Sequence, residues 1–386
     1  MRSNALKLIR EPLGISPSNC GDVTAIVSDV FRALLQKVGS GAHTNKPLTR
    51  SEAERAASLM LQQHATPAQI GAFLIAHRIR RPTSVELAGM LDAYDRFAPT
   101  LKPISSDRVP LVFCHPYDGR SRTAPVGIVT ALILATAGCP AILHGGDRMP
   151  TKMGLPAIEI WRALDVPFHF LTLSQAREVL QATGIGFIYM PQHFPLGQGL
   201  VPYREQIGKR PPLATLELMW NPYGGRSRLV CGYVHPPTEK LMRGTLQLRG
   251  VEDYLTLKGM EGSCDLPRDR VVICGIHRSS ETEFERLCLA PRDYDLAGLD
   301  EPGREAEAIA ADYRQILEGQ SSPLLPSVIW NGGFYLWQAG VCESLAAGLE
   351  RAEALLQSDL VAAKLVQLQT CVATKLLVRA STCPDK

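Results

Sequence analysis

The chain has 386 residues, of which 45% are hydrophobic and 20% are charged. These values are ordinary for a globular protein and exclude a disordered or fibrous chain, and the length favours two domains or one large domain with an appendage. Residues 1–270 contain 31 Lys and Arg and 22 Asp and Glu, a net charge of +9. Residues 271–386 contain 10 Lys and Arg and 16 Asp and Glu, a net charge of −6, so the whole chain carries +3. This asymmetry suits an anionic ligand bound by the first two-thirds of the chain, or ordinary surface variation.

No stretch approaches the roughly 18 uncharged apolar residues that a membrane span needs, and residues 1–14 lack the apolar core of a secretory signal. The ten cysteines show neither Cys-x-x-Cys spacing nor a zinc-like His/Cys cluster. We therefore expect reduced thiols, no membrane partner and a cytoplasmic protein.

The first hundred residues carry three helix-start signals at a spacing of 17 residues. Each is a capping box, in which a Thr hydroxyl and a Glu or Gln three positions later satisfy each other's backbone N–H groups. The three pairs are Thr49 and Glu52, Thr66 and Gln69, and Thr83 and Glu86. The pattern predicts a small bundle of short helices.

From about residue 103 short β-prone runs alternate with helical stretches, which predicts a mostly parallel sheet covered on both faces. The predicted strands are 109–113, 141–143, 185–189, 229–234, 254–257 and 271–275. The predicted helices are 127–137, 156–164, 174–182, 304–317 and 344–368. The fold class is therefore α/β, with a helical domain over residues 1–103, joined by helices near 198–220, and an α/β domain over residues 104–386.

Several segments, in order, resemble the anthranilate phosphoribosyltransferase family, a glycosyltransferase family with the nucleoside phosphorylase fold. They are residues 48–54 and 65–79, His144-Gly145, Lys152-x-Gly154, 190–195, 201–204, Asn221-Pro222, 250–252 and 331–340. The likeness spans about residues 20–370. It implies transfer of a phosphoribosyl group from phosphoribosyl pyrophosphate (PRPP) to anthranilate or a related aromatic amine, as in tryptophan biosynthesis. It also implies a Mg²⁺ cofactor and a homodimer.

The loops that carry the chemistry depart from the family pattern, which indicates a divergent paralogue with an eroded PRPP site. The family's glycine-rich first loop is replaced by His115–Arg122, which keeps only Asp118 and Gly119. His144 and Gly145 remain from the second loop. The family's metal-binding Asp-Glu pair is replaced by Cys264-Asp265, so the metal candidates are Asp265 and the nearby Glu261.

Basic residues stand where the glycine cradle is lost. Arg120, Arg122, Arg148 and Lys152 fall in two loops that the resemblance places at one cleft, where guanidinium groups can bind phosphate. Arg204 matches the family's contact to the anthranilate carboxylate. Gly225-Arg-Ser-Arg228 repeats the Gly-Arg-Ser-Arg of residues 119–122. No residue is assigned as a catalytic acid, base or nucleophile.

Three functions stay open. The first is an active transferase with an altered phosphate site, using PRPP and an aromatic amine. The second is a non-catalytic paralogue that binds nucleic acid or another anion through its Arg-rich cleft, although a net charge of +3 is small for a dedicated nucleic-acid binder. The third is a nucleoside phosphorylase, with which Lys152 is compatible.

Overall fold

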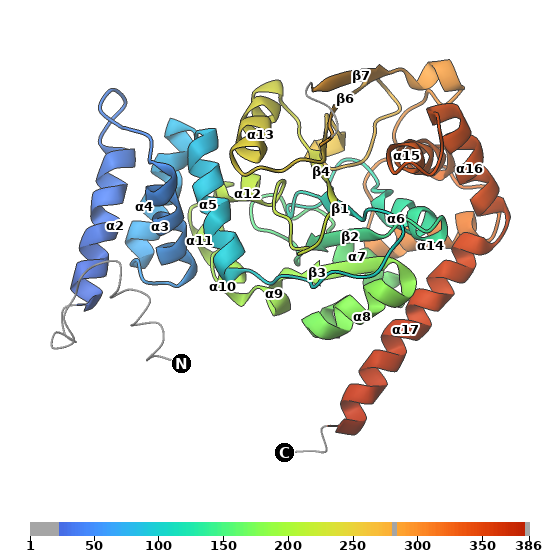
Figure 1. The fold of residues 1–386 in the computed structure, drawn as a ribbon, viewed down its shortest axis with the longest axis horizontal. Coiled ribbons are helices and arrows are strands. Elements are labelled where there is room, and N and C mark those ends of the chain that lie inside the picture. Colours follow the sequence, from blue (N-terminus) through green and yellow to red (C-terminus); the bar gives the residue numbers. More distant parts are fainter. Residues whose placement is uncertain (1–22, 280–283, 383–386) are drawn as a thin grey trace.

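The computed structural model describes residues 23–279 and 284–382, so the expectation about residues 1–14 lies outside it. The described part of the small helical domain contains four helices: α2 (Val23–Gly39), α3 (Arg50–Leu61), α4 (Pro67–Arg80) and α5 (Ser84–Phe97) (Figure 1). The three predicted capping boxes are confirmed, because in each the Thr side chain and the later Glu or Gln side chain both accept the expected backbone N–H. The local sequence therefore sets where three of these helices begin.

Glu86 does more than cap its own helix. Its carboxylate is fully buried and accepts the backbone N–H of Thr83 at 2.8 Å and of Leu48 at 3.0 Å, and it pairs with Arg80. These contacts join the starts of α3 and α5 to the end of α4. Burial alone would raise the pKa of Glu86, but hydrogen bonds from His77, Arg80 and Leu48 outweigh it and hold the pKa well below its ordinary value of 4.5.

This lowered pKa predicts acid sensitivity. The stabilisation from Glu86 is present above pH 4.5 and is lost as the pH falls below that value. We expect Glu86→Gln to lower the free energy of unfolding at pH 7 by on the order of 3 kcal/mol and to flatten its dependence on pH below 5. Urea denaturation followed by circular dichroism would measure both. The more exposed capping residue Glu52 is the control, and an equal loss in Glu52→Gln would contradict the prediction.

Within the described residues the central sheet has seven strands in the order β3-β2-β1-β4-β5-β6-β7. Neighbours among the first five pair in parallel, whereas β6 pairs antiparallel with β5 and β7 antiparallel with β6. Their bounds are β1 (Leu111–Cys114), β2 (Ala141–Gly145), β3 (Ile185–Tyr189), β4 (Arg228–Gly232), β5 (Tyr254–Leu257), β6 (Val272–His277) and β7 (Glu285–Leu289). All six predicted strands are confirmed, within a few residues at their ends. The edge strand β7 was missed because it is mostly exposed and carries charged residues instead of an apolar run.

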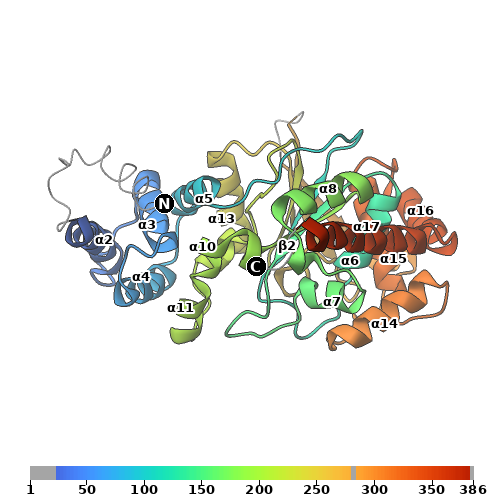
Figure 2. The same ribbon diagram turned by 90° about the horizontal axis from the view of Figure 1, so that it is seen from below.

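The two faces of the sheet pack against different layers because successive side chains on a strand point to opposite sides. On β1, Leu111 and Phe113 enter the core formed with one set of helices, while Val112 and Cys114 enter the core shared with the helical domain. The first set is α6 (Gly127–Thr136), α7 (Ala157–Ala163), α14 (Ala306–Leu317), α15 (Leu325–Gln338), α16 (Leu345–Gln357) and α17 (Leu360–Thr382) (Figure 2). α8 (Leu173–Thr183) packs on the edge strand β3.

Short helices connect the two domains. They are α9 (Met190–His193), α10 (Pro195–Gln198), α11 (Val201–Gln206), α12 (Leu213–Leu216) and the longer α13 (Pro236–Leu248). α11 contacts α4, while α12 and α13 contact α5. These contacts place helices of the segment 198–220 against the helical domain. The division of the chain at residue 103, and the assignment of these helices to the first domain, stay predictions.

The Asn-Gly-Gly motif at 331–333 lies inside helix α15, which is not among the predicted helices. Its glycines allow close packing: a Cβ on Gly333 would lie 2.7 Å from the backbone of Leu349, and one on Gly348 would overlap the carbonyl oxygen of Gly333. Asn331 is fully buried and accepts the backbone N–H of Leu266 at 2.8 Å. The helix pair α15–α16 therefore supports the segment that contains Asp265.

The predicted helix 344–368 is two helices, because the chain turns at Asp359, whose φ is 57°, between α16 and α17. Residues Leu360–Leu377 of α17 are long and apolar enough to cross a membrane by length and composition alone, a test that the core helix of a soluble protein also passes. One side of α17 packs on the α/β domain, where Val361, Leu368 and Val372 are fully buried.

Candidate functional site

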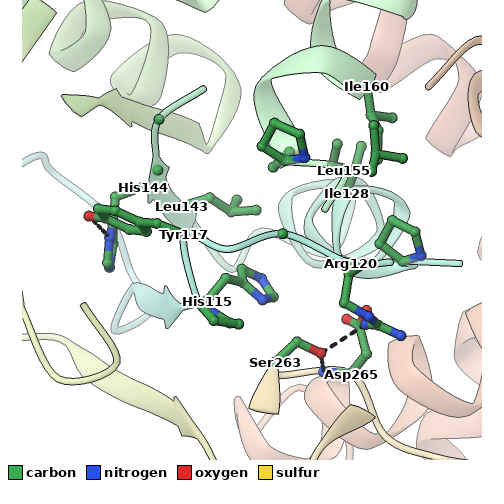
Figure 3. Close-up of a pocket in the computed structure, with 18 residues that line it drawn as sticks. His115, Tyr117, Arg120, Ile128, Leu143, His144, Leu155, Ile160, Ser263 and Asp265 are labelled. Carbon is green, nitrogen blue, oxygen red and sulfur yellow. Dashed lines mark hydrogen bonds and ion pairs between the residues drawn. The ribbon is translucent and has the colours of Figure 1, made fainter. Parts of the chain in front are cut away.

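Three loops meet at the carboxyl ends of the parallel strands, where ligands of α/β sheets usually bind. They follow β1, β2 and β5, and they enclose a cavity of about 60 Å³ (Figure 3). The first two loops are held together by backbone hydrogen bonds between Arg120 and Leu155, and a Cβ on Gly119 would lie 2.5 Å from the carbonyl oxygen of Gly154. Gly119 has a φ of 70°, so both its conformation and its space require glycine.

Arg120 lies inside this site and faces carboxylates of the chain itself. It is only 5% exposed, and its Nη1 donates to Asp265 Oδ2 at 2.6 Å and to Ser263 Oγ at 2.9 Å. Figure 3 shows this group on one side of the cavity and the Tyr117–His144 pair on the other. Asp265 also accepts the backbone N–H of Val126 at 3.2 Å. One of the two metal candidates is therefore neutralised by a predicted anion-binding arginine.

Glu261, the other metal candidate, is bound like an anion in a cradle. Its carboxylate accepts the backbone N–H groups of Ser121 at 3.2 Å, Arg122 at 3.0 Å and Thr123 at 3.1 Å, and it pairs with Lys152 Nζ at 2.7 Å. Burial would raise the pKa of Glu261, but the hydrogen bonds from Lys152 and Arg122 outweigh it and hold the pKa well below its usual range. Its φ of 54° is rarely adopted by a residue other than glycine, so the surrounding contacts hold a strained conformation.

A second buried cluster surrounds Arg204, which is 4% exposed. Arg204 pairs with Asp118 and, at 3.1 Å, with Glu217, while Arg210 lies 2.8 Å from Asp118. Burial raises the pKa of Glu217 to about 6, opposed by the positive charge of Arg204. The guanidinium that was predicted to hold a substrate carboxylate thus already faces two carboxylates of the chain.

His144 is 2% exposed, and its Nδ1 lies 2.6 Å from Tyr117 Oη. Burial, helped by the nearby His115, lowers the pKa of His144 to about 3, so the ring is neutral at pH 7. Its Nε2 has no hydrogen-bond partner among the described residues. His144 therefore keeps one free ring nitrogen in a buried site.

The remaining predicted residues divide between this site and its surroundings. Gly145 ends β2 and lines the cavity. Arg122 is 77% exposed and lies 3.8 Å from Glu261. Arg148 pairs with Glu159 at 2.8 Å and with Glu305 at 2.5 Å, which directs it away from the Glu261 cradle. The structure thus brings Arg120, Arg122 and Lys152 together around Glu261, and leaves Arg148 outside.

Sequence reasoning missed Glu217, Ser263 and Thr123, whose contacts complete these two clusters. Glu217 accepts the backbone N–H of Tyr117 at 3.1 Å, and the hydroxyl of Thr123 donates to Glu261 at 2.9 Å. None of the three stands in a motif that signals a site. Tyr117 is buried and also lines the cavity.

A larger cleft of about 800 Å³ opens between the helical domain and the α/β domain. Its lining includes Arg78, Arg81 and Arg210 on one side and Glu261 on the other. The carboxylate in the cradle therefore borders a space large enough for a small-molecule substrate.

Models of a glycosyl transferase family match two parts of the chain: the helical bundle domain matches residues 32–98 and the α/β domain matches residues 119–360. An anthranilate phosphoribosyltransferase from Halorubrum lacusprofundi is 30% identical over 326 residues, which cover 82% of this chain and 85% of that relative. The chain belongs to the anthranilate phosphoribosyltransferase family of glycosyl transferases.

Other members of the anthranilate phosphoribosyltransferase family agree with this assignment. The enzyme of that name from Rhodopseudomonas palustris is 28% identical over 346 residues, which cover 88% of this chain and 97% of the relative. The anthranilate phosphoribosyltransferase from Saccharomyces cerevisiae, solved in complex with PRPP and Mg, has a TM-score of 0.75 and covers 90% of this chain and 98% of its own. At 13% sequence identity that likeness shows the shared fold alone.

Proposed function

We propose that this protein transfers the phosphoribosyl group of PRPP to anthranilate or a related aromatic amine, at a rate far below that of an ordinary family member. The names of its relatives support the reaction. The low rate rests on one observation: the Glu261 carboxylate occupies the cradle of backbone N–H groups and Lys152 that a pyrophosphate group would need.

PRPP has to displace this carboxylate before it can use the same donors. The competition is intramolecular, so Glu261 is present at a high effective concentration and weakens the binding of any anion from solution. The same argument applies to the amine substrate, because a carboxylate that binds Arg204 must replace Asp118 or Glu217. Both substrates therefore meet a guanidinium or ammonium group that is already paired.

A Mg²⁺ cofactor is consistent with the yeast relative solved with PRPP and Mg. The two candidate carboxylates of this chain do not fit that ion as they lie, because Asp265 faces Arg120 and Glu261 faces Lys152. No group of three or more His, Cys, Asp or Glu side chains suited to a metal occurs among the described residues. Magnesium binding would require at least one of these ion pairs to open.

The alternative of nucleic-acid binding through Arg120, Arg122 and Arg148 has weaker support. Arg120 is buried and Arg148 is paired with two glutamates, so only Arg122 of the three presents a largely exposed guanidinium. This alternative expects salt-dependent binding to DNA or RNA that weakens when all three are changed to Ala. Failure to bind at low salt would exclude it.

The proposal includes a cytoplasmic location and a homodimer. Exposed apolar side chains on the helical domain, such as Ile79 at 77% exposure, are suited to a contact between subunits. Light scattering after size-exclusion chromatography would give the oligomeric state.

The decisive experiment is a turnover assay of the purified protein with PRPP, Mg²⁺ and anthranilate, next to a relative such as the Rhodopseudomonas palustris enzyme. We expect product at a rate at least about 100-fold lower than that of the relative, since the removal of one electrostatic stabiliser of the transition state costs about 3 kcal/mol. Equal turnover would contradict the self-paired site. A complete absence of product, also with related aromatic amines, would reject the transferase function.

A further inference from the structure

A second polar pocket lies at the opposite edge of the sheet from the cleft. It has a volume of about 410 Å³, within the range of small-molecule sites. It is bordered by the starts of β1 and β4, by the residue that follows antiparallel β6, and by the end of α15. Its lining includes Arg226 and Arg228, which belong to the second copy of the Gly-Arg-Ser-Arg motif. Neither arginine lines the cavity or the cleft of the candidate transferase site.

Positive charge dominates this pocket, because four arginines line it against two aspartates. Asp253 pairs with Arg228 at 2.5 Å and so fixes one guanidinium in place, and Arg108 donates to the carbonyl oxygen of Gly340 at 3.0 Å. Arg226 is exposed and has no carboxylate partner among the described residues. The other two charged residues in the lining are Arg278 and Asp107. The pocket therefore offers guanidinium groups to an anion, for which their forked geometry suits a phosphate.

One buried side chain in the lining lacks any partner. Gln338 is 2% exposed, yet neither its Nε2 nor its Oε1 forms a hydrogen bond among the described residues. A buried amide without partners is unfavourable, and such groups normally bind water or a ligand. The amide carries a donor and an acceptor side by side, which matches the paired acceptor and donor on the edge of a nucleobase. Both atoms are covered as they lie, so the side chain has to turn into the pocket to meet a base. The half-buried Trp337 beside it can add an aromatic contact.

We infer that this pocket binds a nucleotide, with Arg226 and Arg108 at the phosphate and the Gln338 amide at the edge of the base. This inference does not depend on the transferase activity, because none of these residues lines the cavity or the cleft. The nucleotide is either a free small molecule or one unit of a single-stranded nucleic acid, since both carry the same phosphate and base.

Isothermal titration calorimetry of the full chain tests the inference with the four common ribonucleoside monophosphates, with inorganic pyrophosphate and with a single-stranded oligonucleotide. We expect at least one monophosphate to bind more tightly than pyrophosphate. Arg226→Ala should weaken its binding about tenfold, the usual effect of losing a charge-assisted hydrogen bond. Arg122→Ala, in the matching motif at the cleft, and Arg55→Ala, an exposed arginine on α3, should leave it unchanged.

Gln338→Met separates recognition of the base from recognition of the phosphate. We expect it to lower the affinity for the nucleotide to that for pyrophosphate, and to leave pyrophosphate binding as it is. The inference is overturned if no nucleotide binds better than pyrophosphate, or if Arg122→Ala weakens binding and Arg226→Ala does not. Tighter binding of the oligonucleotide than of the monophosphate would identify nucleic acid as the source, and the reverse would identify a free nucleotide.

Discussion

Arg204→Ala is expected to lower the free energy of unfolding by about 3–5 kcal/mol, because it leaves two buried carboxylates without their shared cation. Asp118 is 2% exposed and Glu217 is 8% exposed, so water cannot replace the guanidinium. Chemical denaturation of the variant and the parent protein at pH 7 would measure the loss. The matched control is Arg210→Ala, since Arg210 pairs with the same Asp118 but is 39% exposed. Its loss should be within about 1 kcal/mol, and equal losses in the two variants would refute the argument.

The pH dependence of stability gives a second test of the Arg204 cluster. Burial raises the pKa of Glu217 from its ordinary 4.5 to about 6. Its favourable contribution is therefore present below pH 4.5 and is lost as the pH rises through about 6. Arg204→Ala should make this fall in the free energy of unfolding steeper and move it to higher pH, because the cation that favours the charged form of Glu217 is gone. The double variant Arg204→Ala/Glu217→Gln should no longer show the fall. If its pH profile equals that of Arg204→Ala, Glu217 is not the group responsible.

Glu261→Asn is expected to raise the affinity for inorganic pyrophosphate by at least about tenfold, because it removes the charge that competes for the cradle. Asn tolerates the left-handed conformation that this position requires, since φ is 54°. The backbone N–H groups of Ser121 and Arg122, together with Lys152, would then be free for a phosphate. Calorimetric titration with pyrophosphate gives the affinities directly.

Glu305→Gln is the matched control for this change, because Glu305 pairs with the neighbouring Arg148 but does not contact the cradle. It should bind pyrophosphate as weakly as the parent protein does. If Glu261→Asn also leaves the affinity unchanged, the cradle is not a phosphate site, and the family reaction cannot use these donors. If the affinity rises, the turnover assay should be repeated with this variant.

The sequence predicted the elements whose information is local. The three Thr caps, the strands Ile185–Tyr189 and Tyr254–Leu257 and the helix that starts at Gly127 depend on side chains within a few positions of each other. The edge strand β7 and the helix around residues 331–333 were not predicted. Strand β7 forms by pairing with β6 and has no apolar pattern of its own. The glycines at 332 and 333 do not mark a turn, because they allow α16 to pack closely against α15.

The sequence suggested which loops lie together, but it did not predict which of their side chains pair. The first two loops are adjacent in the structure, as the backbone hydrogen bonds between Arg120 and Leu155 show, and their role in binding stays a prediction. Which cation meets which carboxylate depends on side-chain directions across long separations in sequence, such as the 145 positions between Arg120 and Asp265. The sequence suggests that Arg120 is free to bind an anion and that Asp265 is free to bind a metal, whereas in the folded chain the two form a salt bridge with each other. The pairs of Arg148 with Glu159 and of Arg204 with Glu217, 11 and 13 positions apart, are closer in sequence.

The packing of Gly333 against Gly348 bears on how such a protein can evolve. Any side chain at either position would collide with the backbone of the opposite helix, so each replacement requires the two helices to separate. A change of that kind has no gradual route through single substitutions. The exposed end of Arg122, by contrast, can be replaced without moving a neighbouring backbone. Residues of the cleft can therefore change one at a time during evolution, whereas the two glycines of this helix pair are retained and keep the family recognisable.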